Sequence, residues 1–194
     1  RDSKVQEDNN IYMNYKAILF YLGLFIFPLS GLAFLNILYS TYFDYFLSID
    51  SYTVTFFLAL VTGSFFYYYG KNSIKKINFY EQLFLIILVY LISSIFIALP
   101  YYLSNYQITF FDSVFESFSG LTSTGFSIFE NIKYLDPTLI LWRSSSQWIG
   151  GLYFLIFLII IFSNNQYNFR LNQLVFTGNM GSFSKSNTKN ILLQ

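Results

Sequence analysis

The sequence predicts an all-α integral membrane protein with four membrane-spanning helices and one short re-entrant helix. Three observations lead to this fold class. Hydrophobic residues make up 55% of the 194 residues, while charged residues make up only 11%, against roughly 25% in soluble domains. Long intervals of the chain contain no charge at all. A patterned segment too short to cross a bilayer lies before the last of these intervals.

Four charge-free intervals are long enough to span a membrane. A helix needs about 20 mostly apolar residues to cross roughly 30 Å of hydrocarbon. The strongest apolar cores cover residues 17–38, 53–69, 83–103 and 142–162. We expect a spanning helix over each core, with Pro28 kinking the first one.

The charges between the spans give an orientation. The first connection contains Asp44 and Asp50 and no base, whereas the second contains Lys71, Lys75 and Lys76. The positive-inside rule therefore places both chain ends and the second connection in the cytoplasm. On this assignment the inner segments hold nine bases and four acids, and the outer segments hold two bases and six acids.

Missing residue types exclude several functions. The chain contains no His and no Cys, which removes thiol nucleophiles, imidazole bases, disulfides and ordinary zinc sites. A net charge of +1 offers no basic face for nucleic acid. The sequence thus predicts neither an enzyme nor a nucleic-acid-binding protein.

A short helix is predicted in the connection at residues 104–143. Thr109 followed three residues later by Asp112 resembles a capping box with Asp in place of the usual Glu. Apolar residues then recur at helical spacing, and a glycine follows that is placed to end the helix with a positive φ. The apolar residues are Phe111, Val114, Phe115 and Phe118, and the glycine is Gly120.

The segment from Leu121 to Phe126 is rich in hydroxyl side chains around Gly125. Non-helical backbone at membrane depth is tolerated where it is buried in protein or lines a watery path. A short helix that directs its negative end at such a segment is the architecture of a cation filter made of backbone carbonyls. The spacing alone fits a Ser/Thr-rich outer turn equally well.

Other polar residues carry two interpretations each. Asp112 and Glu116 lie four residues apart, as a catalytic pair could, but acids favoured by a helix N-terminus are the better interpretation; Glu116 is also a candidate for holding the filter. Arg143 either extends to the membrane interface or pairs with an acid of the short helix. Gly150 and Gly151 are expected to serve close helix packing.

The segment around Gly125 resembles the first pore loop of the Trk/Ktr/HKT superfamily of potassium uptake proteins, which carries the pattern Phe-Glu…Ser-Gly-Leu-Thr-Thr-Thr-Gly. The matching residues are Phe115, Glu116, Ser119, Gly120, Leu121, Thr122, Ser123, Thr124 and Gly125. Further matches keep the family order across residues 15–155: Pro28, Ala98-Leu99-Pro100, Leu135-Asp136, Trp142-Arg143 and Gln147-Trp148-Ile149-Gly150-Gly151.

The resemblance implies a two-helix N-terminal unit and then helix–pore loop–helix repeats, four of which surround one pore. Residues 1–10 would be a cytoplasmic tail and residues 11–76 the two-helix unit. Residues 77–163 would be the first repeat, and residues 164–194 a cytoplasmic segment leading toward an absent second repeat. We therefore expect the chain to be part of a longer protein.

The resemblance also assigns the site. The carbonyls of Thr122, Ser123, Thr124 and Gly125 would bind the ion as one quarter of a filter, and Asp112, Glu116 and Gly120 would support the pore helix. Two positions depart from the family: Ser123 replaces a common Thr, and Tyr153 stands where a small Gly is usual. The second departure is expected to change packing beside the pore.

The function implied is uptake of a monovalent cation across the plasma membrane, with potassium as the transported ion, sodium as the alternative, and no cofactor. The expected partners are the lipid bilayer, the remaining pore repeats from the same polypeptide or other subunits, a second copy in a homodimer, and a cytoplasmic nucleotide-binding regulatory subunit. A non-conducting membrane interaction or regulatory protein that retains the fold is the rival hypothesis, motivated by Tyr153 and the missing repeats.

Overall fold

The computed structural model of the chain describes residues 13–45, 49–73 and 77–164. The expected tail at residues 1–10, Lys75 and Lys76, and all but the first residue of the segment 164–194 lie outside the described residues. The chain divides into two compact units, one ending at Phe157 and the other beginning at Leu158. All contacts given below lie within the first unit.

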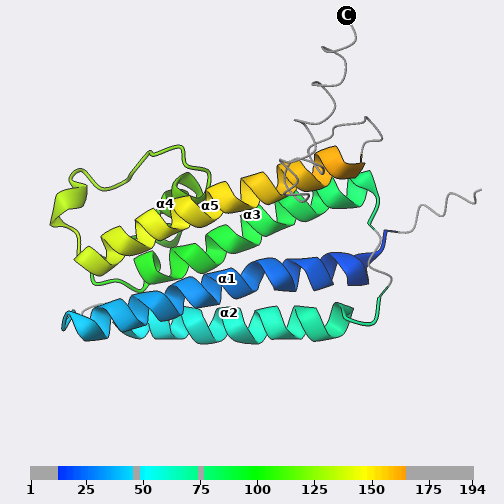
Figure 1. Cartoon of the computed structure of the whole chain (residues 1–194). Helices are drawn as coiled ribbons and strands as arrows, with labels where there is room; N and C mark the ends of the chain where they lie inside the picture. The colour runs from blue at the N-terminus through cyan, green and yellow to red at the C-terminus, as the bar shows by residue number, and fades with distance from the viewer. Residues whose placement is uncertain (1–12, 46–48, 74–76, 165–194) are drawn as a thin grey trace, which may run out of the picture. The chain divides into compact units, whose positions relative to one another are not determined.

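The described residues form helices and no strand. In order along the chain they are α1 (Tyr15–Tyr42), α2 (Ile49–Gly70), α3 (Phe79–Tyr102), α4 (Phe110–Leu121), the 3-10 turn η2 (Ile132–Tyr134) and α5 (Pro137–Asn164) (Figure 1). By length and composition α1, α2, α3 and α5 can each cross a membrane. The prediction of an all-α, multi-pass membrane protein is confirmed.

Local signals set where the helices begin. Asn14 caps α1, because its side-chain oxygen accepts a hydrogen bond from the Ala17 N–H at 3.2 Å and so satisfies a free donor of the first turn. Glu81 does the same at α3, where its carboxylate accepts from the Asn78 N–H at 2.7 Å. Pro28 lies inside α1 without interrupting it.

Glycines allow α1 and α2 to pack closely. A β-carbon added to Gly23 would lie 2.8 Å from the Gly63 carbonyl oxygen, and one added to Gly70 would lie 2.4 Å from the Lys16 carbonyl oxygen. Both distances are far below van der Waals contact, so only residues without a side chain fit there. Small residues serve the same purpose in membrane helix pairs generally.

Hydrogen bonds join this helix pair to the rest of the unit. Tyr52 of α2 donates its buried hydroxyl to Thr138 Oγ1 of α5 at 3.2 Å. Tyr153 of α5 donates to the carbonyl oxygen of Phe25 in α1, and the two rings meet edge to face with centroids 5.1 Å apart. Glu81 of α3 accepts from the Asn14 N–H before α1.

The short helix α4 has an unusual distribution of side chains. Its buried residues are mostly small or polar: Ser113, Glu116, Ser117, Ser119, Gly120 and Leu121. Its apolar stripe points outward instead, with Phe111 83% exposed, Phe115 50% and Phe118 40%. The polar face packs against α3, where Ser117 Oγ donates to the Ser94 carbonyl oxygen at 2.8 Å. An outward apolar face is stable only in contact with lipid or other protein.

Candidate functional site: a carbonyl-lined loop after a short helix

The start of α4 agrees with the sequence, but its end does not. Thr109 Oγ1 accepts from the Asp112 N–H at 3.2 Å and donates to the Asp112 carboxylate at 2.6 Å, which confirms the predicted cap. Gly120 was expected to end the helix with a positive φ, and this prediction is wrong. The helix runs on to Leu121, and Gly120 is not among the residues with positive φ.

Gly120 is needed for packing rather than for a turn. A β-carbon there would lie 2.5 Å from Ser146 Oγ of α5. One turn further along α5, a β-carbon on Gly150 would lie 1.8 Å from the carbonyl oxygen of Leu121. The last turn of α4 therefore rests directly on the backbone of α5, and the predicted packing role of Gly150 is confirmed. Gly151, in contrast, has open space around it.

Beyond Leu121 the backbone turns sharply. Ser123 has a φ of 56° and Gly125 a φ of 83°, both in the left-handed region that glycine adopts most easily. The N–H groups of Thr122, Ser123 and Thr124 fold back onto the carbonyls of Phe118, Gly120 and Ser119 at 2.9–3.1 Å. The donors of this segment thus point at the helix end.

The carbonyl oxygens of the same segment are left without donors. Among the described residues, no hydrogen bond reaches the carbonyl oxygens of Thr122, Ser123, Thr124 or Gly125, and all four residues are exposed. The run ends at Phe126, whose carbonyl accepts from Ser119 Oγ at 2.6 Å and Arg143 Nη2 at 3.2 Å. Four successive acceptors therefore remain available beside the negative end of α4.

A buried ion pair holds the chain beyond this run. Glu116 has a fully buried side chain, and one carboxylate oxygen accepts from Arg143 Nε at 2.6 Å. The carboxylate also accepts from Ser127 Oγ at 3.2 and 3.0 Å and from the Ile128 N–H at 3.0 Å. Glu116 and Arg143 together therefore fix residues 126–128 against α4 and α5; we call this arrangement the Glu116–Arg143 clamp.

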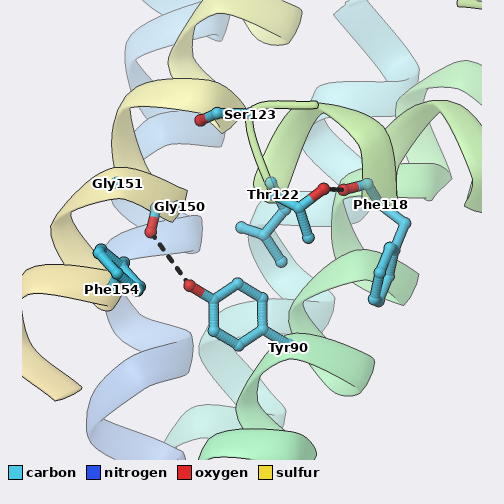
Figure 2. A pocket seen from close by; sticks show the side chains of 8 residues that line it. Tyr90, Phe118, Thr122, Ser123, Gly150, Gly151 and Phe154 are labelled. Carbon is cyan, nitrogen blue, oxygen red and sulfur yellow. Dashed lines mark hydrogen bonds between the residues drawn. The ribbon is translucent and has the colours of Figure 1, made fainter. Parts of the chain in front are cut away.

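A cavity of about 460 Å³ lies beside the loop. Figure 2 shows Tyr90 of α3 donating its hydroxyl to the Gly150 carbonyl oxygen, with Phe154 below and Thr122 opposite; the hydrogen bond measures 3.3 Å. Ser123 and Gly151 also line the cavity. Tyr153 is not among the lining residues, because its side chain is buried against Phe25 of α1.

Comparison with known proteins finds relatives among cation transporters. An uncharacterized cation transporter of Methanocaldococcus jannaschii is 31% identical over 116 residues, which is 57% of this chain and 24% of that protein. The Trk system potassium uptake protein TrkH of Salmonella typhimurium is 28% identical over 151 residues, which is 77% of this chain and 31% of that protein. Over part of its length, this chain is similar to Trk-type potassium uptake proteins.

A shorter part of the chain matches another Trk protein at higher identity. The Trk system potassium uptake protein TrkI of Halomonas elongata is 42% identical over 59 residues, which is 30% of this chain and 12% of that protein. The chain thus spans less than a third of the length of these relatives. No family model and no solved structure matched the sequence.

The structure brings some of the site residues expected from the sequence together and separates others. Thr122, Ser123, Thr124 and Gly125 form one continuous exposed run. Glu116 and Asp112, considered above as a pair of acids near the helix N-terminus, have different environments. Asp112 is exposed at the first turn of α4, whereas Glu116 is buried and paired with Arg143. Of the two interpretations of Arg143, the ion pair is the one the structure shows.

Sequence reasoning gave no role to three serines that make hydrogen bonds beside the loop. Ser119, Ser127 and Ser146 each make a hydrogen bond next to the loop, at 2.6 Å, 3.0 Å and 2.7 Å respectively. A serine within a Ser-rich connection gives no signal of its own. The only available indication for Ser119 was its place inside the resembling motif.

Replacing Ser123 by glycine is expected to stabilise the loop after α4. Serine at a φ of 56° loses roughly 1 kcal/mol relative to glycine, which adopts this conformation freely. Its hydroxyl contact with the Gln147 carbonyl, at 3.5 Å, adds little. Thermal unfolding in detergent should show a higher midpoint for Ser123→Gly.

Thr124→Gly provides the matched control, because Thr124 has no positive φ and its hydroxyl bonds to Ser119. This variant should unfold at a lower temperature than the parent protein. Equal destabilisation by both substitutions would contradict the strained conformation of Ser123.

Proposed function

We propose that this chain supplies one of four pore loops of a monovalent cation uptake protein, with potassium as the transported ion. The observation that carries the proposal is the run of four donor-free carbonyls at Thr122, Ser123, Thr124 and Gly125. Carbonyl rings replace the hydration shell of a cation in selectivity filters. Neutral carbonyl oxygens suit a monovalent ion as ligands, because no fixed negative charge then holds the ion too tightly to leave.

The electrostatics of the loop support a cation path. The negative end of the α4 dipole meets the loop. The nearest buried charges, Glu116 and Arg143, neutralise each other at 2.6 Å, so they do not add a barrier of either sign. Among the described residues, no group of three or more acidic side chains is available to hold a multivalent metal.

The names of the relatives favour the same function. They are potassium uptake proteins and a cation transporter, so we propose cation uptake for the protein of which this chain is a part. In this proposal residues 11–76 are the N-terminal helix pair and residues 77–163 the first repeat. The remaining repeats, a second copy and a cytoplasmic nucleotide-binding regulatory subunit complete the assembly in the plasma membrane, with both ends of this segment in the cytoplasm.

The alternative hypothesis of a non-conducting protein rested on Tyr153 and on the missing repeats, and the position of Tyr153 no longer favours it. Tyr153 was expected to disturb packing beside the pore, yet its ring packs edge to face on Phe25 of α1 and it does not line the cavity beside the loop. A large residue at this position is therefore compatible with an open loop.

Replacing Gly125 by alanine tests the proposed filter. A side chain at a φ of 83° strains the backbone by roughly 1–2 kcal/mol and turns the carbonyl away. The ratio of potassium to sodium flux into liposomes containing the full-length protein should fall about tenfold or more. Gly31→Ala in α1, where a β-carbon also meets open space, should leave flux unchanged. Unaltered selectivity of Gly125→Ala would refute the filter assignment. Dominant sodium flux in the parent protein would mean that sodium, and not potassium, is the transported ion.

A further inference from the structure

Gly125 differs from the rest of the proposed filter run in the way it is held. In the described part of the chain, no hydrogen bond involves its N–H or its carbonyl oxygen, and a β-carbon on it would meet no atom within 4 Å. Glycine also has the widest choice of backbone conformations. The direction of the Gly125 carbonyl therefore depends on the residues before and after it.

Both neighbours of Gly125 bond to the same residue, Ser119 in the last turn of α4. Thr124 donates its N–H to the Ser119 carbonyl oxygen at 3.1 Å, and its hydroxyl contacts Ser119 Oγ at 3.1 Å and that carbonyl oxygen at 3.3 Å. On the other side of Gly125, Ser119 Oγ donates its proton to the Phe126 carbonyl oxygen at 2.6 Å. Ser119 thus closes a ring around Gly125 and holds both of its ends.

The Glu116–Arg143 clamp holds only one end of this ring. Arg143 Nη2 donates to the Phe126 carbonyl oxygen at 3.2 Å, and no hydrogen bond among the described residues joins Arg143 to Thr124. Ser119 is 4% exposed, so water has little access to replace its hydroxyl. Ser119 is therefore the residue that joins the two ends.

We propose that Ser119 is a positioning residue for ion selection that acts through Gly125. Its hydroxyl fixes the direction of the Gly125 carbonyl by tying Thr124 to Phe126. A carbonyl held in one direction offers a binding distance suited to one ion radius, whereas a carbonyl that swings freely coordinates a smaller ion equally well. The inference rests on the proposed filter for its effect on transport; its effect on the loop backbone is independent of transport.

Ser119→Ala in the full-length protein tests the proposal, with Ser117→Ala as the matched control. Ser117 is a buried serine of the same helix, but its hydroxyl bonds to the carbonyl oxygens of Ser94 in α3 and Val114 in α4, both at 2.8 Å. Because one hydrogen bond at the loop is lost, Ser119→Ala should lower the potassium-to-sodium flux ratio about fivefold. Ser117→Ala should unfold at a lower temperature but keep the ratio within about twofold of the parent value. An equal fall of the ratio in both variants would mean that general destabilisation is the cause, and would overturn the proposal.

Thr124→Val removes the hydroxyl that bonds to Ser119 from the loop side. Valine keeps the branched shape and the N–H of Thr124 and replaces only the hydroxyl, by a methyl group. This variant should lower the flux ratio about twofold, and its combination with Ser119→Ala should lower the ratio by clearly less than the product of the two single effects. A full product would mean that the two residues act on the filter separately, which contradicts the ring. Thr124 is exposed, so Thr124→Val also tests the proposal if Ser119→Ala fails to fold.

Amide hydrogen exchange at Thr124 reports on the loop without any transport, because its N–H is bonded to the Ser119 carbonyl oxygen. Ser119→Ala should speed this exchange about fivefold, whereas Ser117→Ala should leave it unchanged. If Ser119→Ala alters neither the flux ratio nor the exchange while Gly125→Ala still lowers the ratio, the positioning role is overturned and the filter proposal stays intact. If the parent protein transports no cation, the proposed function fails and the exchange decides alone. Faster exchange in Ser119→Ala but not in Ser117→Ala then supports the positioning role, and equal exchange in both overturns it.

Discussion

Replacing Gly150 by alanine is expected to lower the free energy of unfolding by about 3 kcal/mol or more. The new β-carbon would lie 1.8 Å from the carbonyl oxygen of Leu121 and 2.6 Å from its carbonyl carbon. Both are backbone atoms at the end of α4, so no side-chain rotation removes the clash. The last turn of α4 must move off α5 and take the following loop with it. Thermal unfolding and the yield of monodisperse protein measure the effect.

The neighbouring residue provides an unusually close control. Gly151 occupies the same helix, yet a β-carbon on it meets no atom within 4 Å. Gly151→Ala should therefore keep the stability of the parent protein, or gain up to about 1 kcal/mol from the better helix propensity of alanine. Similar behaviour of the two variants would mean that α4 does not rest on the α5 backbone at Gly150.

Replacing Glu116 by glutamine is expected to destabilise the chain by about 3–5 kcal/mol. Glutamine keeps the size of the side chain and an oxygen for the Ile128 N–H, but it leaves the charge of Arg143 unpaired. The Arg143 side chain is only 12% exposed, so water compensates little of that charge. Loss of the clamp should also release residues 126–128 and reduce ion selectivity in the flux assay.

Two further variants show whether the effect of Glu116→Gln comes from the lost charge or from the changed side chain. Asp112→Asn changes an exposed acid four residues away, where only the helix dipole and one hydroxyl contact are involved, and should lower stability by less than about 1 kcal/mol. The double variant of Glu116→Gln and Arg143→Gln removes both charges and should recover part of the loss. A double variant as unstable as the sum of both single variants would contradict a direct ion pair.

The spanning helices could be predicted because one physical quantity determines them. A helix in hydrocarbon excludes charge from most of its length, so the charge-free intervals located all four spans. The start of α4 was predictable for a similar reason, since the Thr109 and Asp112 pair satisfies free donors within three residues. Local chemistry of this kind is fully contained in the sequence.

The interior of the candidate site could not be predicted, because it depends on distant residues. The sequence left two interpretations of Arg143 open, and only the fold shows that it pairs with the buried Glu116, 27 positions earlier. Gly120 shows the other difficulty. A glycine at the end of a helical pattern is typical of a C-terminal cap, and nothing local distinguishes this from a glycine required by Ser146 of another helix.

The contacts between the helix pair α1–α2 and the later helices also order events during synthesis. The pair leaves the ribosome before α3, α4 and α5, and its close packing at Gly23 and Gly70 involves only residues of α1 and α2. The Phe25 carbonyl oxygen of this pair accepts a hydrogen bond from Tyr153, which is translated 128 positions later. A truncated nascent chain that ends before α5 should therefore hold a closed pair whose final partners arrive last. We therefore expect the first two helices to form before the remainder of the chain packs against them.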